Sequence, residues 1–154
     1  MKIQKLIKPE NIFLDLAATD VESALAAVAD LFAPKLGLEP EDVVESLLER
    51  ERLGSTSVGD EFAIPHCKVQ GLREIALALG RFPTAVAFGS EDTDPVAFVF
   101  VVLSPLDQPA AHLQVLSQIA RVLKRKELRS ELLAAADAEE VVAAICRTAE
   151  SEGL

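Results

Sequence analysis

The stretch VAFVFVVL, residues 96–103, is the longest apolar run of the chain. It is far shorter than the roughly 20 residues that a membrane-spanning helix needs. Val and Phe favour strands, and a strand that is apolar at every position has both of its faces buried. We therefore predict a strand over 94–103 at the centre of a sheet, covered on both sides by helices.

Further strands are predicted on the N-terminal side of this run. IFLDLA (12–17) alternates in polarity, and REIALALGRF (73–82) has strand character, so both are predicted to be strands. Turn-forming residues fill GSTSVGDEF (54–62), which we predict to be a loop. Pro65 then holds Ile64 in an extended conformation, because a residue before proline avoids the α region.

Two helices are predicted between the first strand and this loop. TDVE (19–22) fits a capping box in which Thr19 and Glu22 satisfy the first amides of a helix. That helix is expected to run to about Leu36 and to stop at Gly37. A second helix is expected from Glu39 to Gly54, with Pro40 in its first turn. Its expected buried stripe is Val43, Val44, Leu47 and Leu48.

The C-terminal third has a helical period. One helix is expected to bury a stripe formed by Leu113, Leu116, Ile119, Ala120 and Leu123. A short helix follows in KRKELRSELLAAA (124–136), and a last helix is opened by an Asp137/Glu140 capping box. These elements predict an α/β fold: a three-layer α/β/α sandwich with a mixed, mostly short-stranded sheet. The 154 residues contain no linker or repeat and fit a single domain, residues 1–154.

Composition excludes several functional classes. The formal net charge of −10 argues against a nucleic-acid binder, which needs a basic face, and the absence of Trp and Tyr argues against base stacking. The first residues, MKIQKLIKPENIF, lack the apolar core of a signal peptide, so a cytoplasmic location is expected. Cys67 and Cys146 form no disulfide framework, and CxxC and HExxH motifs are missing, so neither metal nor cofactor is expected.

His66 follows Pro65 and the Gly/Ser/Thr-rich segment, in AIPH. Functional residues are often displayed on such loops. A partly buried structural histidine is the alternative, because histidine is intermediate in burial. Cys67 is poorly placed to form a nucleophile pair with His66, since adjacent strand residues point to opposite faces. Ser55, Ser57 and Ser104 lack the setting of a nucleophile elbow, and 54–59 lacks the ending of a phosphate-binding P-loop.

His112 and Arg50 are the other candidates. His112 shares the azimuth of Leu116, Ile119 and Leu123, and it falls in the first turn if Gln108 caps the helix. A neutral imidazole there could donate to a phosphoryl group; spacing alone favours a core histidine bonded to a backbone carbonyl.

Arg50 fits either a solvated helix C-terminus or a phosphate fork. Spacing does not distinguish it from Arg52.

The segment LLERERLGSTSVGDEFAIPHCKV (47–69) resembles the signature of the fructose/mannitol-type EIIA domains of the bacterial phosphoenolpyruvate-dependent sugar phosphotransferase system. That group includes the nitrogen-regulatory EIIA proteins. Its pattern is approximately R-E-x-x-G-S-T-x-x-G-x-x-x-A-I-P-H. A later family helix reads H-L-x-x-L-x-x-I-A, which HLQVLSQIA (112–120) matches. The resemblance covers nearly the whole chain.

The resemblance implies roles for three residues. His66 corresponds to the phosphorylated histidine, while Arg50, sixteen residues earlier, and His112 correspond to residues that hold the phosphoryl group. The sequence departs from the pattern at Ser57, where Gly is frequent, at Phe62, where a smaller aliphatic is common, and at Cys67, where Gly or Ala is frequent. None of these departures removes a group that the reaction needs.

The implied function is that of a phosphocarrier. It would accept a phosphoryl group from HPr, or its nitrogen-branch homologue, and pass it to an EIIB domain or act on regulatory targets, with peripheral contact to a membrane transporter. The length fits the regulatory branch better than the transport branch. A neutral imidazole, with its ordinary pKa near 6.5, is a competent nucleophile, and no nucleotide or metal is needed.

An apolar rim for a donor protein is expected at Val58, Phe62 and Ile64, although these side chains fit a plain core equally well. Two other functions are considered: a pure protein-interaction module of the same fold, and a hydrolase with a Cys or Ser nucleophile. The joint presence of Arg50, His66 and His112 favours the phosphocarrier over the first. The missing nucleophile elbow argues against the second.

Overall fold

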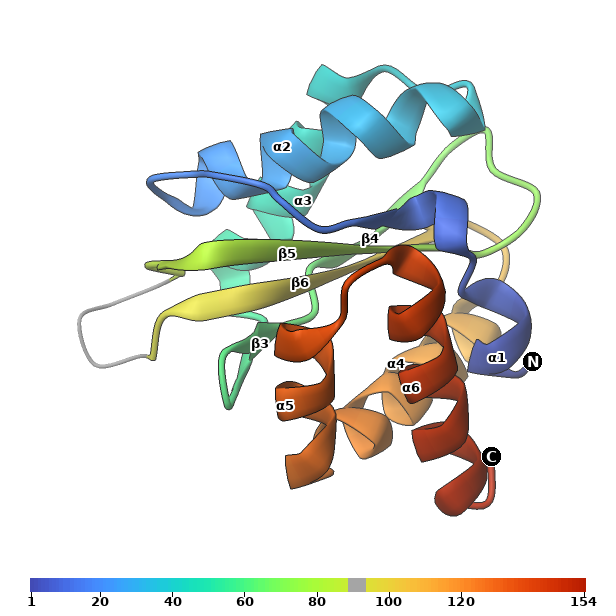
Figure 1. Ribbon diagram of the computed structural model, residues 1–154. Coiled ribbons are helices and arrows are strands. Elements are labelled where there is room, and N and C mark those ends of the chain that lie inside the picture. Colours follow the sequence, from blue (N-terminus) through green and yellow to red (C-terminus); the bar gives the residue numbers. More distant parts are fainter. Residues whose placement is uncertain (89–93) are drawn as a thin grey trace.

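The computed structural model describes residues 1–88 and 94–154, which form three layers (Figure 1). Strand β6 (Val96–Pro105) lies at the centre of a mixed sheet of order β1-β5-β6-β3-β2, and β4 pairs with β6 as well. All residues of β6 are buried. The predicted central strand is therefore confirmed.

The other strands flank β6 on its two edges. On one edge, β5 (Ala76–Val86) runs antiparallel to β6 and pairs in parallel with β1 (Ile12–Phe13). On the other edge, β3 (Phe62–Ala63) and β4 (His66–Val69) both run parallel to β6. The short strand β2 (Ser57–Gly59) pairs antiparallel with β3 and completes the sheet.

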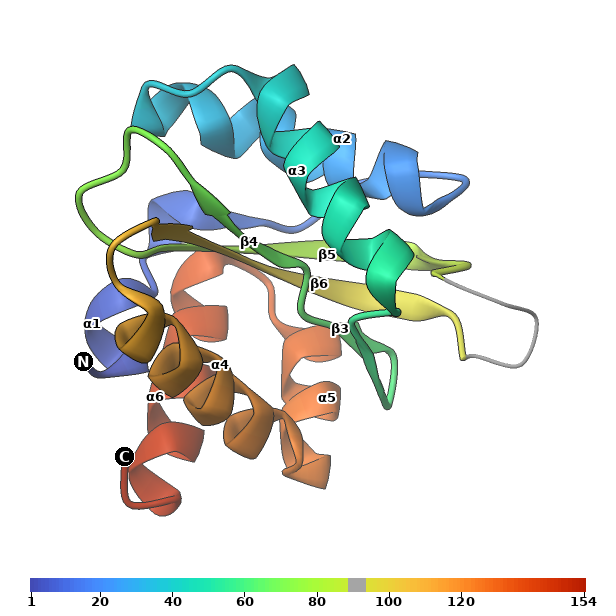
Figure 2. The same cartoon turned by 180° about the vertical axis from the view of Figure 1, so that it is seen from behind.

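Helices cover both faces of the sheet, as expected. One face carries α2 (Val21–Phe32), the 3-10 turn η2 (Ala33–Leu36) and α3 (Pro40–Leu53) (Figures 1 and 2). The opposite face carries the remaining helical elements: α1 (Ile3–Leu6), η1 (Pro9–Asn11), α4 (Pro109–Leu123), α5 (Lys126–Ala134) and α6 (Ala138–Ser151). The three-layer α/β/α architecture is confirmed.

Alternation along β6 divides the interior into two cores. Val99, Val101 and Leu103 point into the core beneath α2 and α3. Phe98, Phe100 and Val102 point into the core beneath α4, α5 and α6. A strand that supplies both cores must be apolar at every position, which explains the run VAFVFVVL.

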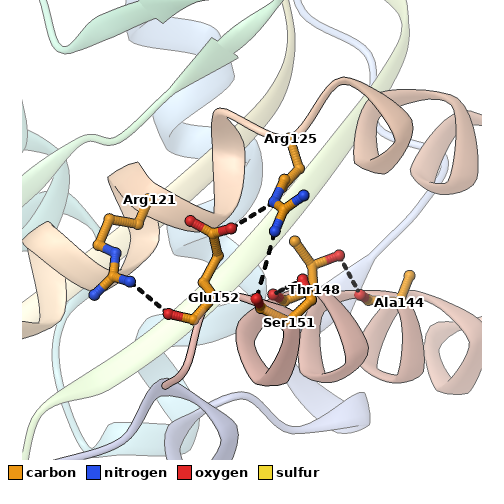
Figure 3. A network of polar contacts seen from close by, with 6 residues as sticks. All are labelled: Arg121, Arg125, Ala144, Thr148, Ser151 and Glu152. Carbon is orange, nitrogen blue, oxygen red and sulfur yellow. Dashed lines mark hydrogen bonds and ion pairs between the residues drawn. The ribbon is translucent and has the colours of Figure 1, made fainter.

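A polar network holds the C-terminal end of the chain against α4 and α5 (Figure 3). The Arg125 guanidinium pairs with the Glu152 carboxylate, and Arg121 donates to the Glu152 carbonyl oxygen. Arg125 also donates to the Ser151 carbonyl oxygen at 3.4 Å. Since these bonds join the end of α6 to the turn between α4 and α5, they keep the three helices packed together.

The N-terminal capping prediction was wrong by one residue. The N-cap of α2 is Asp20, whose carboxylate accepts from the Ser23 amide at 2.8 Å, while the Ser23 hydroxyl accepts from the Asp20 amide at 3.1 Å. Asp20 and Ser23 have the same i, i+3 spacing as Thr19 and Glu22, so the pattern fits both. The predicted strand at 12–17 is also shorter, because only Ile12 and Phe13 pair with β5.

The segment predicted as a loop at 54–62 contains a tight hairpin. Strands β2 and β3 are joined through Gly59, Asp60 and Glu61, with φ angles of 89°, 54° and 70°. Positive φ at non-glycine residues is uncommon and is best tolerated by residues such as Asp. Helix α3 ends at Gly54, and Gly37 has a left-handed φ of 71°, so both predicted stops are confirmed.

In the C-terminal helices the predicted faces were partly wrong. Leu113 is exposed, whereas Val115 and Val122 are buried, so the apolar stripe of α4 is rotated from the predicted one. Asp137 caps α6 as predicted by accepting from the Glu140 amide at 2.9 Å. The Glu140 carboxylate accepts from the Ala136 amide instead of the Asp137 amide.

Candidate functional site

His66 is the first residue of β4. Strands β3 and β4 pair with the same edge of β6, and a short gap that contains Pro65 separates them. Ala63 in β3 lies opposite Val99, and His66 lies opposite Val102, so the register on β6 is the same before and after the gap. Pro65 lacks the amide hydrogen that a continuous ladder would use. The Pro65 carbonyl oxygen still accepts from the Val102 amide at 3.0 Å, so the neighbouring Ile64 backbone groups point away from β6.

The Ile64 carbonyl fixes the tautomer of His66. Its oxygen lies 2.7 Å from His66 Nδ1. Because a carbonyl oxygen can only accept, Nδ1 carries the hydrogen and Nε2 keeps its lone pair. The half-buried His66 imidazole therefore has its nucleophilic nitrogen free.

His112 lies beside His66 and is held by a residue that the sequence did not single out for this role. The two imidazole ring centroids are 5.5 Å apart. His112 is buried in the first turn of α4, and its Nδ1 lies 2.5 Å from the hydroxyl oxygen of the buried Ser104. The predicted inward orientation is confirmed, but the partner is a hydroxyl instead of a backbone carbonyl.

Ser104 sets His112 in the opposite tautomer. The Ser104 hydroxyl is buried, so its hydrogen needs an acceptor within the protein. Within residues 1–88 and 94–154 its one hydrogen-bond partner is His112 Nδ1, so Ser104 donates to that nitrogen. That leaves the hydrogen of His112 on Nε2. The pair thus combines a nitrogen lone pair on His66 with an N–H donor on His112.

Burial keeps both imidazoles neutral. It is the main cause that lowers the pKa of His66, with a smaller lowering by Arg50; the Ile64 hydrogen bond and the Glu51 charge act in the opposite direction. Burial also lowers the pKa of His112, with smaller contributions from His66 and Lys68. Since the ordinary histidine pKa is near 6.5, the neutral forms dominate at pH 7.

The structure separates the two candidate arginines. The Arg50 guanidinium donates to the Gly54 carbonyl oxygen at 2.9 Å, and its charge acts on His66. Arg52 instead lines a groove of about 380 Å³ between α2 and α3, together with residues such as Ala26 and Leu48. Two residues on a helix are about 200° apart, so only Arg50 is turned toward the histidine pair.

Cys67 is unsuited to act as a nucleophile. It packs against the core beneath α2 and α3, while His66 contacts His112 on the opposite face of the sheet. Burial raises the pKa of the Cys67 thiol to about 12. The thiolate, which is the reactive form, is therefore scarce at neutral pH.

The predicted apolar rim is only partly correct. Phe62 and Ile64 are 1% and 5% exposed and belong to the core, so two of the three expected rim residues were wrong. Val58 is exposed, as expected. Three further exposed apolar residues belong to segments next to the candidate residues, and with Val58 we call them the apolar rim: Leu53, Val58, Leu106 and Leu113.

The described residues contain neither a metal-binding cluster nor a membrane-spanning helix. Across residues 1–88 and 94–154 no cluster of three or more His, Cys, Asp or Glu side chains is arranged to hold a metal ion. In the same part of the chain no helix has the length and apolar character to cross a membrane.

The fold is that of a phosphotransferase-system EIIA component. Residues 5–147 match the family model described as phosphoenolpyruvate-dependent sugar phosphotransferase system, EIIA 2. The chain belongs to this family, and the resemblance seen in its sequence is confirmed.

Individual relatives support this assignment. The chain is 37% identical over 141 residues to a nitrogen regulatory protein of Bradyrhizobium diazoefficiens, covering 92% of each. A crystal structure of nitrogen regulatory protein IIA-Ntr from Neisseria meningitidis superposes with a TM-score of 0.86 at 32% identity, covering 93% of this chain and 98% of that one. The crystal structure of IIA mannitol from Escherichia coli gives a TM-score of 0.75 at 27% identity, with 90% and 97% coverage.

Proposed function

We propose that this protein is a phosphocarrier whose acceptor is Nε2 of His66. The observation that carries the proposal is the neutral histidine pair: ring centroids 5.5 Å apart, a lone pair on one ring and an N–H on the other. Membership of the EIIA 2 family supports phosphoryl transfer as the reaction class.

The transfer step follows from these positions. The Nε2 lone pair of His66 attacks the phosphorus of a phosphohistidine donor, and the donor's N–P bond breaks with its electron pair returning to the donor nitrogen. His66 keeps its Nδ1 hydrogen, so positive charge develops on its ring. The Ile64 carbonyl oxygen, 2.7 Å from Nδ1, stabilises that charge.

His112 and Arg50 stabilise the phosphoryl oxygens in this proposal. His112 Nε2–H donates a hydrogen bond, and the Arg50 guanidinium contributes positive charge. Prepositioned donors of this kind lower the barrier without reorganising during the reaction. In this proposal the chain contributes alignment and charge through His112, Arg50 and the Ile64 carbonyl oxygen.

The donor and acceptor are proposed from the family. The donor is HPr or its nitrogen-branch homologue, and the recipient is an EIIB domain or a regulatory target, all in the cytoplasm. The regulatory branch is favoured, because the relatives at 37% and 32% identity are nitrogen regulatory proteins while the mannitol protein is at 27%. The whole chain, residues 1–154, acts as one domain in this proposal.

Intact mass after incubation with phosphoenolpyruvate, Enzyme I and HPr tests the proposal, with the nitrogen-branch pair run in parallel. We expect one acid-labile phosphoryl adduct that His66→Ala abolishes. His112→Ala should still accept the phosphoryl group, but more slowly. Cys67→Ser is the matched control and should transfer at the wild-type rate.

Absence of an adduct with both donor pairs would refute the phosphocarrier and leave the interaction module. An adduct that persists in His66→Ala would place the phosphoryl group elsewhere.

A further inference from the structure

The backbone that orients His66 is itself held by a side chain of α3. The Glu51 carboxylate accepts from the Thr56 amide at 3.1 Å and also from the Thr56 hydroxyl. Thr56 is a buried polar residue, 6% exposed, so these bonds lie largely out of water. Replacing Glu51 would leave the polar groups of Thr56 without these acceptors.

Thr56 continues the series toward the histidine. Its carbonyl oxygen accepts from the Ile64 amide at 3.0 Å, and the Ile64 carbonyl oxygen accepts from His66 Nδ1 at 2.7 Å. The Ile64 groups are available for these bonds because backbone groups alternate in direction along a strand: the Pro65 carbonyl oxygen accepts from β6, so the Ile64 groups point away from it. An unbroken series of hydrogen bonds therefore runs from Glu51 to the imidazole.

We propose that Glu51 is a positioning residue that, through Thr56 and Ile64, fixes the ring orientation and the tautomer of His66. Glu51 itself needs no contact with the phosphoryl group. The consequence for transfer rests on the proposed function, whereas the consequence for the tautomer does not.

The charge of Glu51 adds a second effect to this geometry. Arg50 and Glu51 are neighbours in α3 and act on His66 in opposite directions: Arg50 lowers the pKa of His66 and Glu51 raises it. The Glu51 carboxylate therefore acts on His66 through its charge as well as through its hydrogen bonds to Thr56. Charge and hydrogen bonding can therefore be separated by mutation.

Nitrogen-15 NMR of the unphosphorylated protein tests the proposal directly, because the Nδ1 and Nε2 shifts of His66 report its tautomer and their pH dependence reports its pKa. Glu51→Ala and Thr56→Val should shift His66 from the pure Nδ1–H form toward a mixture of tautomers. Glu51→Gln retains an acceptor for Thr56 but no charge, so it should keep the tautomer and lower the pKa of His66. Glu49→Ala, on the same helix and exposed, is the matched control.

Transfer rates from phosphorylated HPr complete the test. The rate with Glu51→Ala should fall about tenfold, as expected for loss of orientation, and Glu51→Gln should recover most of it. Far-UV circular dichroism confirms that each variant is folded.

Wild-type His66 shifts in both Glu51→Ala and Thr56→Val would overturn the proposal. If those shifts change but no variant, wild type included, accepts a phosphoryl group, then the positioning role stands and the phosphocarrier function fails.

Discussion

The hydroxyl oxygen of Ser104 lies 2.5 Å from Nδ1 of His112, and both residues are buried. Ser104 comes from the end of β6 and His112 from the first turn of α4, so this bond joins the central strand to the helix that follows it. It also determines which nitrogen of His112 can face a phosphoryl group.

Ser104→Ala should slow phosphoryl transfer to His66 by about tenfold, because His112 would no longer be fixed in the Nε2–H tautomer. Loss of a buried hydrogen-bond partner should also lower the free energy of unfolding by about 1–3 kcal/mol. Stopped-flow transfer assays and urea denaturation measure the two effects. Ser117→Ala, at an exposed position of α4, the helix that carries His112, should leave both the transfer rate and the stability unchanged. An unaltered rate in Ser104→Ala would contradict the role assigned to Ser104.

Acidification should destabilise the protein through the histidine pair. The pKa of His66 and that of His112 are both lowered on folding, so the unfolded state binds more protons between the folded values and 6.5. Their contribution to the free energy of unfolding is therefore complete above pH 6.5 and is lost as the pH falls through the lowered folded values. Urea denaturation of wild type and of a His66→Ala/His112→Ala variant at about pH 7.5 and about pH 5 isolates this part. We expect the wild type to lose more stability than the variant, and equal losses would disprove the assignment.

The apolar rim should contribute to donor binding. Leu106 and Leu113 are 58% and 66% exposed; Leu106 lies two residues after Ser104, and Leu113 directly follows His112. Leu106→Asp and Leu113→Asp should each weaken the affinity for HPr about five- to tenfold, about 1–1.4 kcal/mol, by isothermal titration calorimetry. Leu133→Asp is the control, because Leu133 is 44% exposed on α5, outside the rim. Weakening by Leu133→Asp alone would place the docking surface elsewhere.

Gly80 should tolerate no side chain. A Cβ at this position of β5 would lie 2.8 Å from Val28 Cγ2 and 2.9 Å from Leu16 Cδ1. Gly80→Ala should therefore lower the free energy of unfolding by about 1–3 kcal/mol through overpacking beneath α2. Ala85→Val, at an exposed position of the same strand, should have little effect in the same denaturation assay. A neutral Gly80→Ala would mean that the Val28 and Leu16 side chains make room for the added methyl group without cost.

The sequence predicted the architecture because its strongest signals are an unbroken apolar run and glycines at helix ends. An apolar run at 96–103 had to be a central strand, and the stops at Gly37 and Gly54 follow from backbone freedom that only glycine has. The hairpin of β2 and β3 was missed, because its turn continues beyond Gly59 and places Asp60 and Glu61 at positive φ, which is uncommon for residues other than glycine. Patterns specify hydrophobic faces better than they specify short turns.

The candidate site was predicted unevenly for a similar reason. Motif resemblance pointed to His66, His112 and Arg50, and the fold places the two histidine rings side by side with the Arg50 charge acting on His66. The roles of Ser104 and Thr56 were missed because they depend on hydrogen bonds between separate segments of the chain, which no sequence pattern specifies. The alternation of Phe62 and Ile64 fits a rim and a core equally well, and only packing decides between them.

The central position of β6 has a dynamic consequence. His66 is set by its register opposite Val102, and His112 by the helix that leaves the end of the same strand, so one strand carries both alignments. Buried strands paired on both edges exchange their amide hydrogens only through global opening. We therefore expect the slowest hydrogen–deuterium exchange in β6, and the two imidazoles should remain aligned for as long as the molecule stays folded.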